Sequence, residues 1–171
     1  MSNQNEPEIN AADISERLVG IAPVYLQNFL QRRSYGLRSS VSPGKVRSQR
    51  RLFSTEDVYG IALVWELFES GLRGDPIARI LNDVAGTKKA DANKAAAKLR
   101  AGEVAYLLVF RTARHPSKNI SKMPIQKIET VTEEGFARVL KRWPRQSAQV
   151  IAVGEKFADV RKRLDILFDM R

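Results

Sequence analysis

The segment Gly20-Ile21-Ala22-Pro23 constrains the fold of this chain most, because it forces a sharp turn between two short helical patterns. Residues 11–19 carry Ile14 and Leu18 one helical turn apart, and Gly20 then stops the pattern. Pro23 suits the first position of the next helix, where its missing N–H has no helical partner. We therefore predict a helix over 11–19 and a second helix over 23–33, joined by a tight turn.

The predicted helix 23–33 has two chemically different sides. Leu26, Phe29 and Leu30 recur at helical spacing and predict the side that packs inward. The opposite side carries Val24, Tyr25, Gln27, Asn28 and Gln31. Side-chain amides donate and accept hydrogen bonds together, which suits the edges of DNA bases, and a tyrosine can reach a phosphate or a thymine methyl group. We interpret this side as a candidate surface for reading the major groove.

The segment 32–51 is rich in Gly, Pro and Ser, so it predicts a loop. Its basic residues are Arg32, Arg33, Arg38, Lys45, Arg47, Arg50 and Arg51, and it contains no acidic residue. A solvated loop of this length ordinarily mixes charges, so a loop of one sign indicates an anionic partner. We interpret these side chains as contacts to phosphates or to the minor groove.

The clearest helical pattern begins after Ser54, which has capping-box spacing to Asp57. Its apolar stripe consists of Val58, Ile61, Trp65 and Phe68, and we interpret Trp65 and Phe68 as core residues. Gly71 ends this helix, and a further helix with an apolar face follows over 75–84. The order of helix, tight turn, helix, basic loop and capped helix is the arrangement that a DNA-reading platform requires.

The second half of the chain changes character. Residues 86–102 are rich in Ala and Lys and predict a linker helix. A compact apolar run predicts a buried strand over 104–110, shorter strands are predicted over 125–131 and 149–153, and helices are predicted over 132–143 and 155–168. We predict a mainly α protein in four parts. These are a disordered lead over 1–10, a DNA-binding domain over 11–85, the linker helix, and a small α/β module over 103–171 for dimerisation, partner contact or ligand contact.

Composition narrows the partners and the chemistry. The net charge is +10 over 171 residues, which attracts polyanions, with nucleic acid ahead of an anionic membrane surface or a merely solvated cationic surface. The chain contains no Cys, and its one His, His115, lies in a polar basic loop. We therefore expect no catalytic site, no metal and no cofactor, because no thiol, metal cluster or phosphate loop is visible. We expect neither secretion nor membrane insertion, and place the chain in the cytoplasm with the nucleoid.

Three segments in the first half resemble the MerR-type winged helix-turn-helix domain. Gly20-Ile21-Ala22-Pro23-Val24-Tyr25-Leu26 is similar to the family's Gly-Val-Ser-Pro-x-Thr-Leu entry into its recognition helix. Gly36-Leu37 follows that helix, and Arg51-Leu52-Phe53-Ser54-Thr55-Glu56-Asp57-Val58 is similar to the family's Arg-x-Tyr-Ser-x-x-Asp-Val. The resemblance covers roughly residues 11–84.

This resemblance implies a four-helix domain whose second helix and wing contact DNA. Carried over by position, the contacts come from Val24, Tyr25, Gln27 and Asn28 in the helix and from Arg47, Arg50 and Arg51 in the wing. The chain departs from the family at Gln27-Asn28-Phe29, where the family has Arg-Tyr-Tyr. It also lacks the long dimerising helix of many members, and the absence of Cys excludes the metal-responsive branch.

From these features we expect a sequence-specific transcriptional regulator that binds double-stranded DNA as a homodimer, because two half-sites multiply affinity. The sequence leaves open a small-molecule or protein effector. Two alternatives stay open as well. One is a DNA-binding assembly protein similar to a viral small terminase subunit, and the other is an RNA-binding adaptor.

Overall fold

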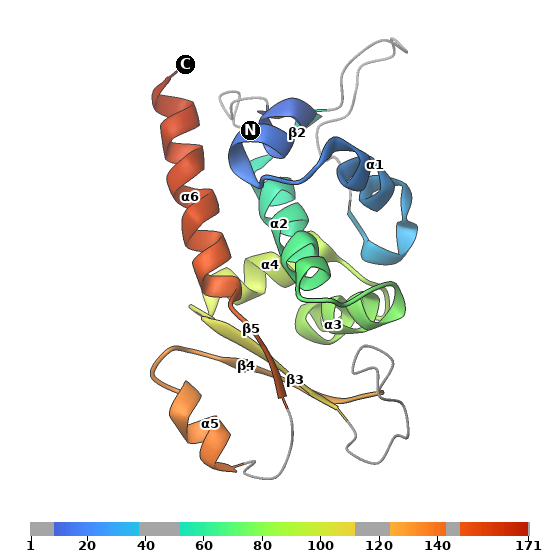
Figure 1. Ribbon diagram of the computed structural model, residues 1–171, viewed down its shortest axis with the longest axis vertical. Coiled ribbons are helices and arrows are strands. Elements are labelled where there is room, and N and C mark those ends of the chain that lie inside the picture. The colour runs from blue at the N-terminus through green and yellow to red at the C-terminus, as the bar shows by residue number, and fades with distance from the viewer. Residues whose placement is uncertain (1–8, 38–51, 112–123, 143–147, 171) are drawn as a thin grey trace, which may run out of the picture.

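The computed structural model describes residues 9–37, 52–111, 124–142 and 148–170. Within these residues the chain is mainly helical, with two small antiparallel sheets (Figure 1). Helix α2 lies at the centre, with α1 and α3 to one side of it and the long helix α6 to the other. The three-stranded sheet lies at one end of the molecule and is followed outward by α5.

The N-terminal elements are β1 (Ile9–Asn10), η1 (Asp13–Leu18) and α1 (Pro23–Gln31). The prediction of a disordered lead over 1–10 is wrong for its last two residues, because β1 pairs antiparallel with β2 (Leu52–Phe53) and Ile9 is fully buried. Element η1 is wound as a π-helix rather than an α-helix. The Asn10 side-chain oxygen begins it by accepting hydrogen bonds from the backbone N–H groups of Ala12 (2.9 Å) and Asp13 (3.0 Å).

The helix predicted to begin after Ser54 is confirmed as α2 (Thr55–Glu69), and it is followed by α3 (Asp75–Ala85). Ser54 Oγ accepts from the Asp57 backbone N–H at 3.2 Å, and the Asp57 carboxylate accepts from the Ser54 backbone N–H at 2.9 Å. This reciprocal pair is the capping box that the spacing predicted, and it satisfies two N–H groups that have no helical partner.

A helix is present within 86–102, as predicted, but it is part of the core and not a linker between two modules. Helix α4 (Ala92–Ala101) packs against α2 and α3 and buries Ala92, Ala95, Ala96 and Leu99. Small side chains let the helices approach closely: a Cβ added at Gly60 on α2 would lie 2.1 Å from the Asn93 side-chain oxygen. The scarcity of large apolar residues therefore indicates close helix packing here and not an exposed connection.

The second sheet has the order β4-β3-β5 and is antiparallel throughout. Its strands are β3 (Tyr106–Arg111), β4 (Ile125–Val131) and β5 (Ala148–Ile151), and its helices are α5 (Phe136–Arg142) and α6 (Val153–Asp169). All five were predicted, β4 with the same bounds. One face of β3 buries Leu107 and Val109 toward α6 and the N-terminal helices, and the other buries Leu108 and Phe110 beside α5.

One continuous core joins the two halves, which the sequence had predicted as separate modules. Apolar residues from β1 through α6 belong to the same buried cluster. Polar contacts add to it: Arg79 on α3 donates to the Ile125 carbonyl at 2.6 Å, and Lys156 on α6 donates to the Val19 carbonyl at 3.2 Å. The C-terminal half therefore supports the N-terminal helices directly. None of the described helices is long and apolar enough to cross a membrane.

Candidate nucleic-acid interface

The outward side of α1 is the candidate site, and its residues are exposed as the helical period predicted. Leu26 and Phe29 are buried beneath the helix. The exposed residues are Val24, Tyr25, Gln27, Asn28 and Gln31. Val24 is 60% exposed and Tyr25 is 40% exposed, which is unusual for apolar and aromatic side chains of this size. The structure therefore brings together the five helical residues that the sequence selected.

Helix α1 is held from below by a small number of large contacts. The Phe29 ring lies 5.2 Å from the ring of Phe68, 6.1 Å from that of Trp65 and 5.7 Å from that of Tyr35, measured between centroids. Pro23 occupies the first turn, and Ala22 provides no side-chain cap. Because its own capping is weak, α1 depends on this aromatic packing for its position.

Helix α1 ends at Gln31, two residues earlier than predicted, so Arg32 and Arg33 do not lie on the recognition helix. Arg32 has an extended backbone, and Arg33 begins the 3-10 turn η2 (Arg33–Tyr35). The early end allows Tyr35 to turn inward, where it is fully buried and its hydroxyl accepts from the Gly74 backbone N–H at 3.3 Å. Both arginines are exposed beside the end of α1.

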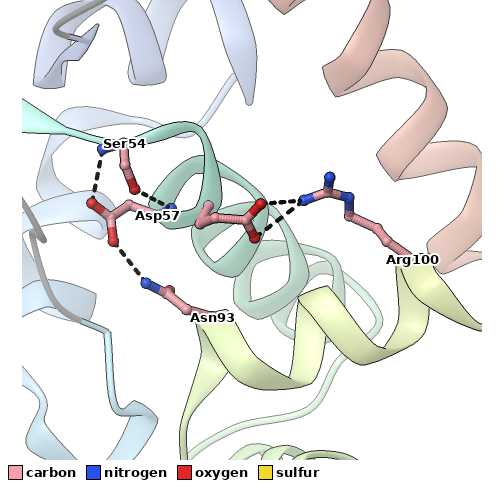
Figure 2. A network of polar contacts seen from close by, with 5 residues as sticks. Ser54, Asp57, Asn93 and Arg100 are labelled. Atoms are coloured by element: carbon pink, nitrogen blue, oxygen red, sulfur yellow. Dashed lines mark hydrogen bonds and ion pairs between the residues drawn. The ribbon is translucent and has the colours of Figure 1, made fainter. Parts of the chain in front are cut away.

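The remaining predicted contacts lie outside the described residues. These are Lys45, Arg47, Arg50 and Arg51. The chain returns from this segment at β2, and the capping box at Ser54 and Asp57 follows directly. Asp57 is fully buried, and its second carboxylate oxygen accepts from the Asn93 side-chain amide at 2.7 Å (Figure 2). The start of α2 is therefore joined to α4 through Asp57.

A second polar contact lies one turn away on the same helices. Arg100 on α4 donates to both carboxylate oxygens of Glu56 at 3.2 Å, as Figure 2 shows. Its guanidinium carbon also lies 3.7 Å from the centroid of the Tyr59 ring. Burial raises the pKa of the Tyr59 hydroxyl, and the neighbouring Arg100 charge offsets part of that rise. This group stabilises the α2–α4 contact and lies apart from α1.

Charge is distributed unevenly between α1 and a cleft elsewhere on the molecule. No acidic residue occurs in the sequence between Glu16 and Glu56, although Glu16 lines a pocket together with Gln27 and Gln31 of α1. A cleft of about 1170 Å³ lies between α2, α4, α6 and the sheet, and none of its lining residues belongs to α1. Its acidic lining consists of Glu56, Glu103, Glu133, Glu134 and Glu155. The same lining includes the basic residues Arg100 and Arg161, so the cleft carries charges of both signs with an acidic excess.

Sequence analysis missed the role of three residues near α1. Trp65 and Phe68 pack against the core, but they are only partly buried and they flank Tyr25. Arg73 lies beyond them, with its guanidinium carbon 3.5 Å from the centroid of the Phe68 ring. The available signal was two aromatic residues at i and i+3 near the end of α2, followed closely by a basic residue.

Within the part of the chain that the structure describes, no group of three or more His, Cys, Asp or Glu side chains could hold a metal ion. No protein-family model matches this chain, and no curated protein matches it either.

Proposed function

We propose that this protein binds double-stranded DNA, reading the major groove with α1 and gripping the backbone with Arg32, Arg33 and the basic segment that follows. The observation that carries the proposal is the outward side of α1. Its amide side chains and Tyr25 are exposed on a helix that contains no charged residue, and the exposed Arg32 and Arg33 follow it directly. Exposed amides suit base edges, and arginines beside them suit phosphates.

The proposed role is that of a transcriptional regulator similar to MerR-type proteins, acting as a homodimer. One α1 helix covers few base pairs, so two copies on neighbouring half-sites increase both affinity and discrimination. The described chain resumes at β2, whose Phe53 is fully buried and which is followed at once by the capped start of α2, and this anchored return supports a wing between α1 and β2.

Alanine variants on α1 test the base-reading part of the proposal. We expect Gln27→Ala or Asn28→Ala to reduce discrimination between a duplex selected from a random pool and a scrambled duplex by between about 5-fold and 150-fold. Gln126→Ala is the matched control, because this amide is exposed on β4, outside α1. Unchanged discrimination in both α1 variants would remove α1 from the proposed interface.

Arginine variants test the backbone-gripping part. Arg50→Ala and Arg51→Ala should each weaken binding to all duplexes by a similar factor and reduce the slope of log affinity against log salt by about 0.9. Lys162→Ala removes an exposed cation from α6 and should leave the slope unchanged. Slopes equal to that of the wild type in both arginine variants would contradict phosphate contacts by Arg50 and Arg51.

Two further measurements separate the regulator from its alternatives. Competition between duplex DNA and RNA at one salt concentration should favour DNA, and a preference for RNA would indicate an adaptor instead. Light scattering should give a dimer, whereas a ring of many copies would favour an assembly protein.

A further inference from the structure

The Tyr25 ring lies against two aromatic side chains of α2. Its centroid is 5.6 Å from that of Trp65 and 5.3 Å from that of Phe68. Tyr25 is also 6.5 Å from Phe29 on its own helix. These separations fall within the range of favourable aromatic pairs. Tyr25 therefore has a packed side, although 40% of it remains exposed.

Trp65 and Phe68 form a rigid support for that ring. Their own rings are stacked, with centroids 5.6 Å apart and planes 15° from parallel. Arg73 lies over the Phe68 ring, and its guanidinium also donates to the backbone carbonyls of Phe68 and Leu72, so Phe68 is fixed by a neighbour on its far side. The support belongs to α2, which does not carry any of the residues assigned to base reading.

The polar end of Tyr25 is unused within the fold. Its hydroxyl makes no hydrogen bond with any of the described residues. A tyrosine that packs by its ring and leaves its hydroxyl exposed has one apolar end and one end open to a partner. Because the ring is already restrained, a partner of the hydroxyl loses less side-chain entropy than it would with a freely rotating tyrosine.

We propose that Trp65 and Phe68 are positioning residues, which hold the Tyr25 ring so that its hydroxyl contacts the DNA duplex. This inference rests on the proposed function and adds two residues of α2 as supports of the proposed DNA interface on α1. It assigns to Tyr25 a contact that depends on its neighbours, whereas Gln27 and Asn28 have no such support. Both aromatic neighbours also contact Phe29, so the part of their effect that passes through Tyr25 is the part that disappears when Tyr25 is removed.

A double-mutant cycle on the full chain tests this coupling. The probe is the duplex that the wild type selects from a random pool, with a scrambled duplex of equal length beside it. Trp65→Leu should lower affinity for the selected duplex by about threefold to tenfold. In a Tyr25→Ala background the same substitution should change affinity by a clearly smaller factor, because only the contact of Trp65 with Phe29 remains to be lost. Trp65→Phe keeps a ring and should restore most of the affinity.

The controls separate positioning from general destabilisation. Tyr106→Leu removes another partly buried aromatic residue, whose ring lies 4.8 Å from Phe136 on the sheet side, and it should leave duplex affinity unchanged. Thermal unfolding establishes that each variant is folded at the assay temperature. Phe68→Leu completes the same cycle if Trp65→Leu is unfolded.

The outcomes distinguish the two levels of the proposal. A wild type that binds no duplex overturns the proposed function and this inference with it. A wild type that binds the selected duplex, but loses equal affinity from Trp65→Leu with and without Tyr25, overturns the inference alone.

Discussion

Helices α1 and α6 use their side chains in opposite ways. The longer helix, α6, buries Val153, Phe157, Val160, Leu164 and Leu167. Its exposed side mixes charges of both signs, as in the Asp159–Arg163 ion pair at 2.9 Å. Helix α1 buries only Leu26 and Phe29 and contains no charged residue. Packing and solvation account for most residues of α6, with the exposed Ile166 as an exception, but they account for only one side of α1.

The difference identifies residues of α1 whose identity is not explained by the stability of the fold. Exposed Val24 and Tyr25 leave apolar surface in water, which costs free energy unless a partner covers it. Gln27 and Asn28 beside them have the hydrogen-bonding groups that a base edge requires. Substitutions on α6 should therefore change stability, whereas substitutions on the outward side of α1 should change binding.

The largest expected effect is on the buried side of α6. Leu164 is 3% exposed, so Leu164→Ala should lower the free energy of unfolding by about 2–5 kcal/mol, measured by urea denaturation. Ile166→Ala on the same helix is the control, because Ile166 is 51% exposed and should change stability by less than about 0.5 kcal/mol. Equal losses at the two positions would mean that α6 does not pack by the side described.

The next effect concerns the buried carboxylate that joins α2 to α4. Asp57→Ala removes the carboxylate that accepts from the Ser54 backbone N–H and leaves the Asn93 amide without its acceptor, so we expect a loss of about 2–4 kcal/mol. Asp83→Ala removes a half-exposed carboxylate 4.0 Å from Arg79 and serves as the control. A loss at Asp57 no larger than the loss at Asp83 would contradict the buried network.

The elements that could be predicted from the sequence are those whose signals are local. The capping box at Ser54 and Asp57 predicted the start of α2, and a compact apolar run predicted β3. The helical spacing of Leu26, Phe29 and Leu30 predicted which side of α1 is exposed. Each of these signals lies within a few residues of the element that it specifies.

The elements that could not be predicted depend on distant partners. Ile9 is buried because it pairs with Phe53, which lies beyond the whole of α1 and the basic segment. Helix α4 looked like a linker because alanines bury little surface individually, and its core position depends on Gly60 of α2. The support of Tyr25 by Trp65 is of the same kind, since no local pattern connects the two residues.

A smaller effect is expected where α6 is attached to the N-terminal elements. The Lys156 ammonium group donates to the Val19 carbonyl at 3.2 Å, at the end of η1. Lys156→Met keeps the aliphatic part and removes the donor, so it should lower the free energy of unfolding by about 0.5–1.5 kcal/mol in urea denaturation. Lys162→Met on the exposed side of α6 should cost less. The reverse order would show that Val19 does not depend on α6.

The smallest effect follows from Glu66, which lies on α2 beside α6. Burial raises the pKa of this carboxyl, while the Lys156 charge lowers it and Glu69 adds to the rise. A raised pKa in the folded state means that folding favours the protonated form, so the stability that Glu66 contributes is complete below its ordinary pKa of 4.5 and declines as the pH rises through the folded value. Glu66→Gln resembles the protonated form at every pH.

This variant should therefore equal the wild type near pH 4 and become slightly more stable than it toward pH 7, as measured by urea denaturation at several pH values. Lys156→Met should widen the difference at neutral pH, because it removes the cation that offsets the burial of Glu66. Affinity for duplex DNA should stay the same throughout, since Glu66 faces α6 and not α1. A wild type that becomes more stable than Glu66→Gln as the pH rises would reverse the sign of this argument and show that ionised Glu66 stabilises the contact between α2 and α6.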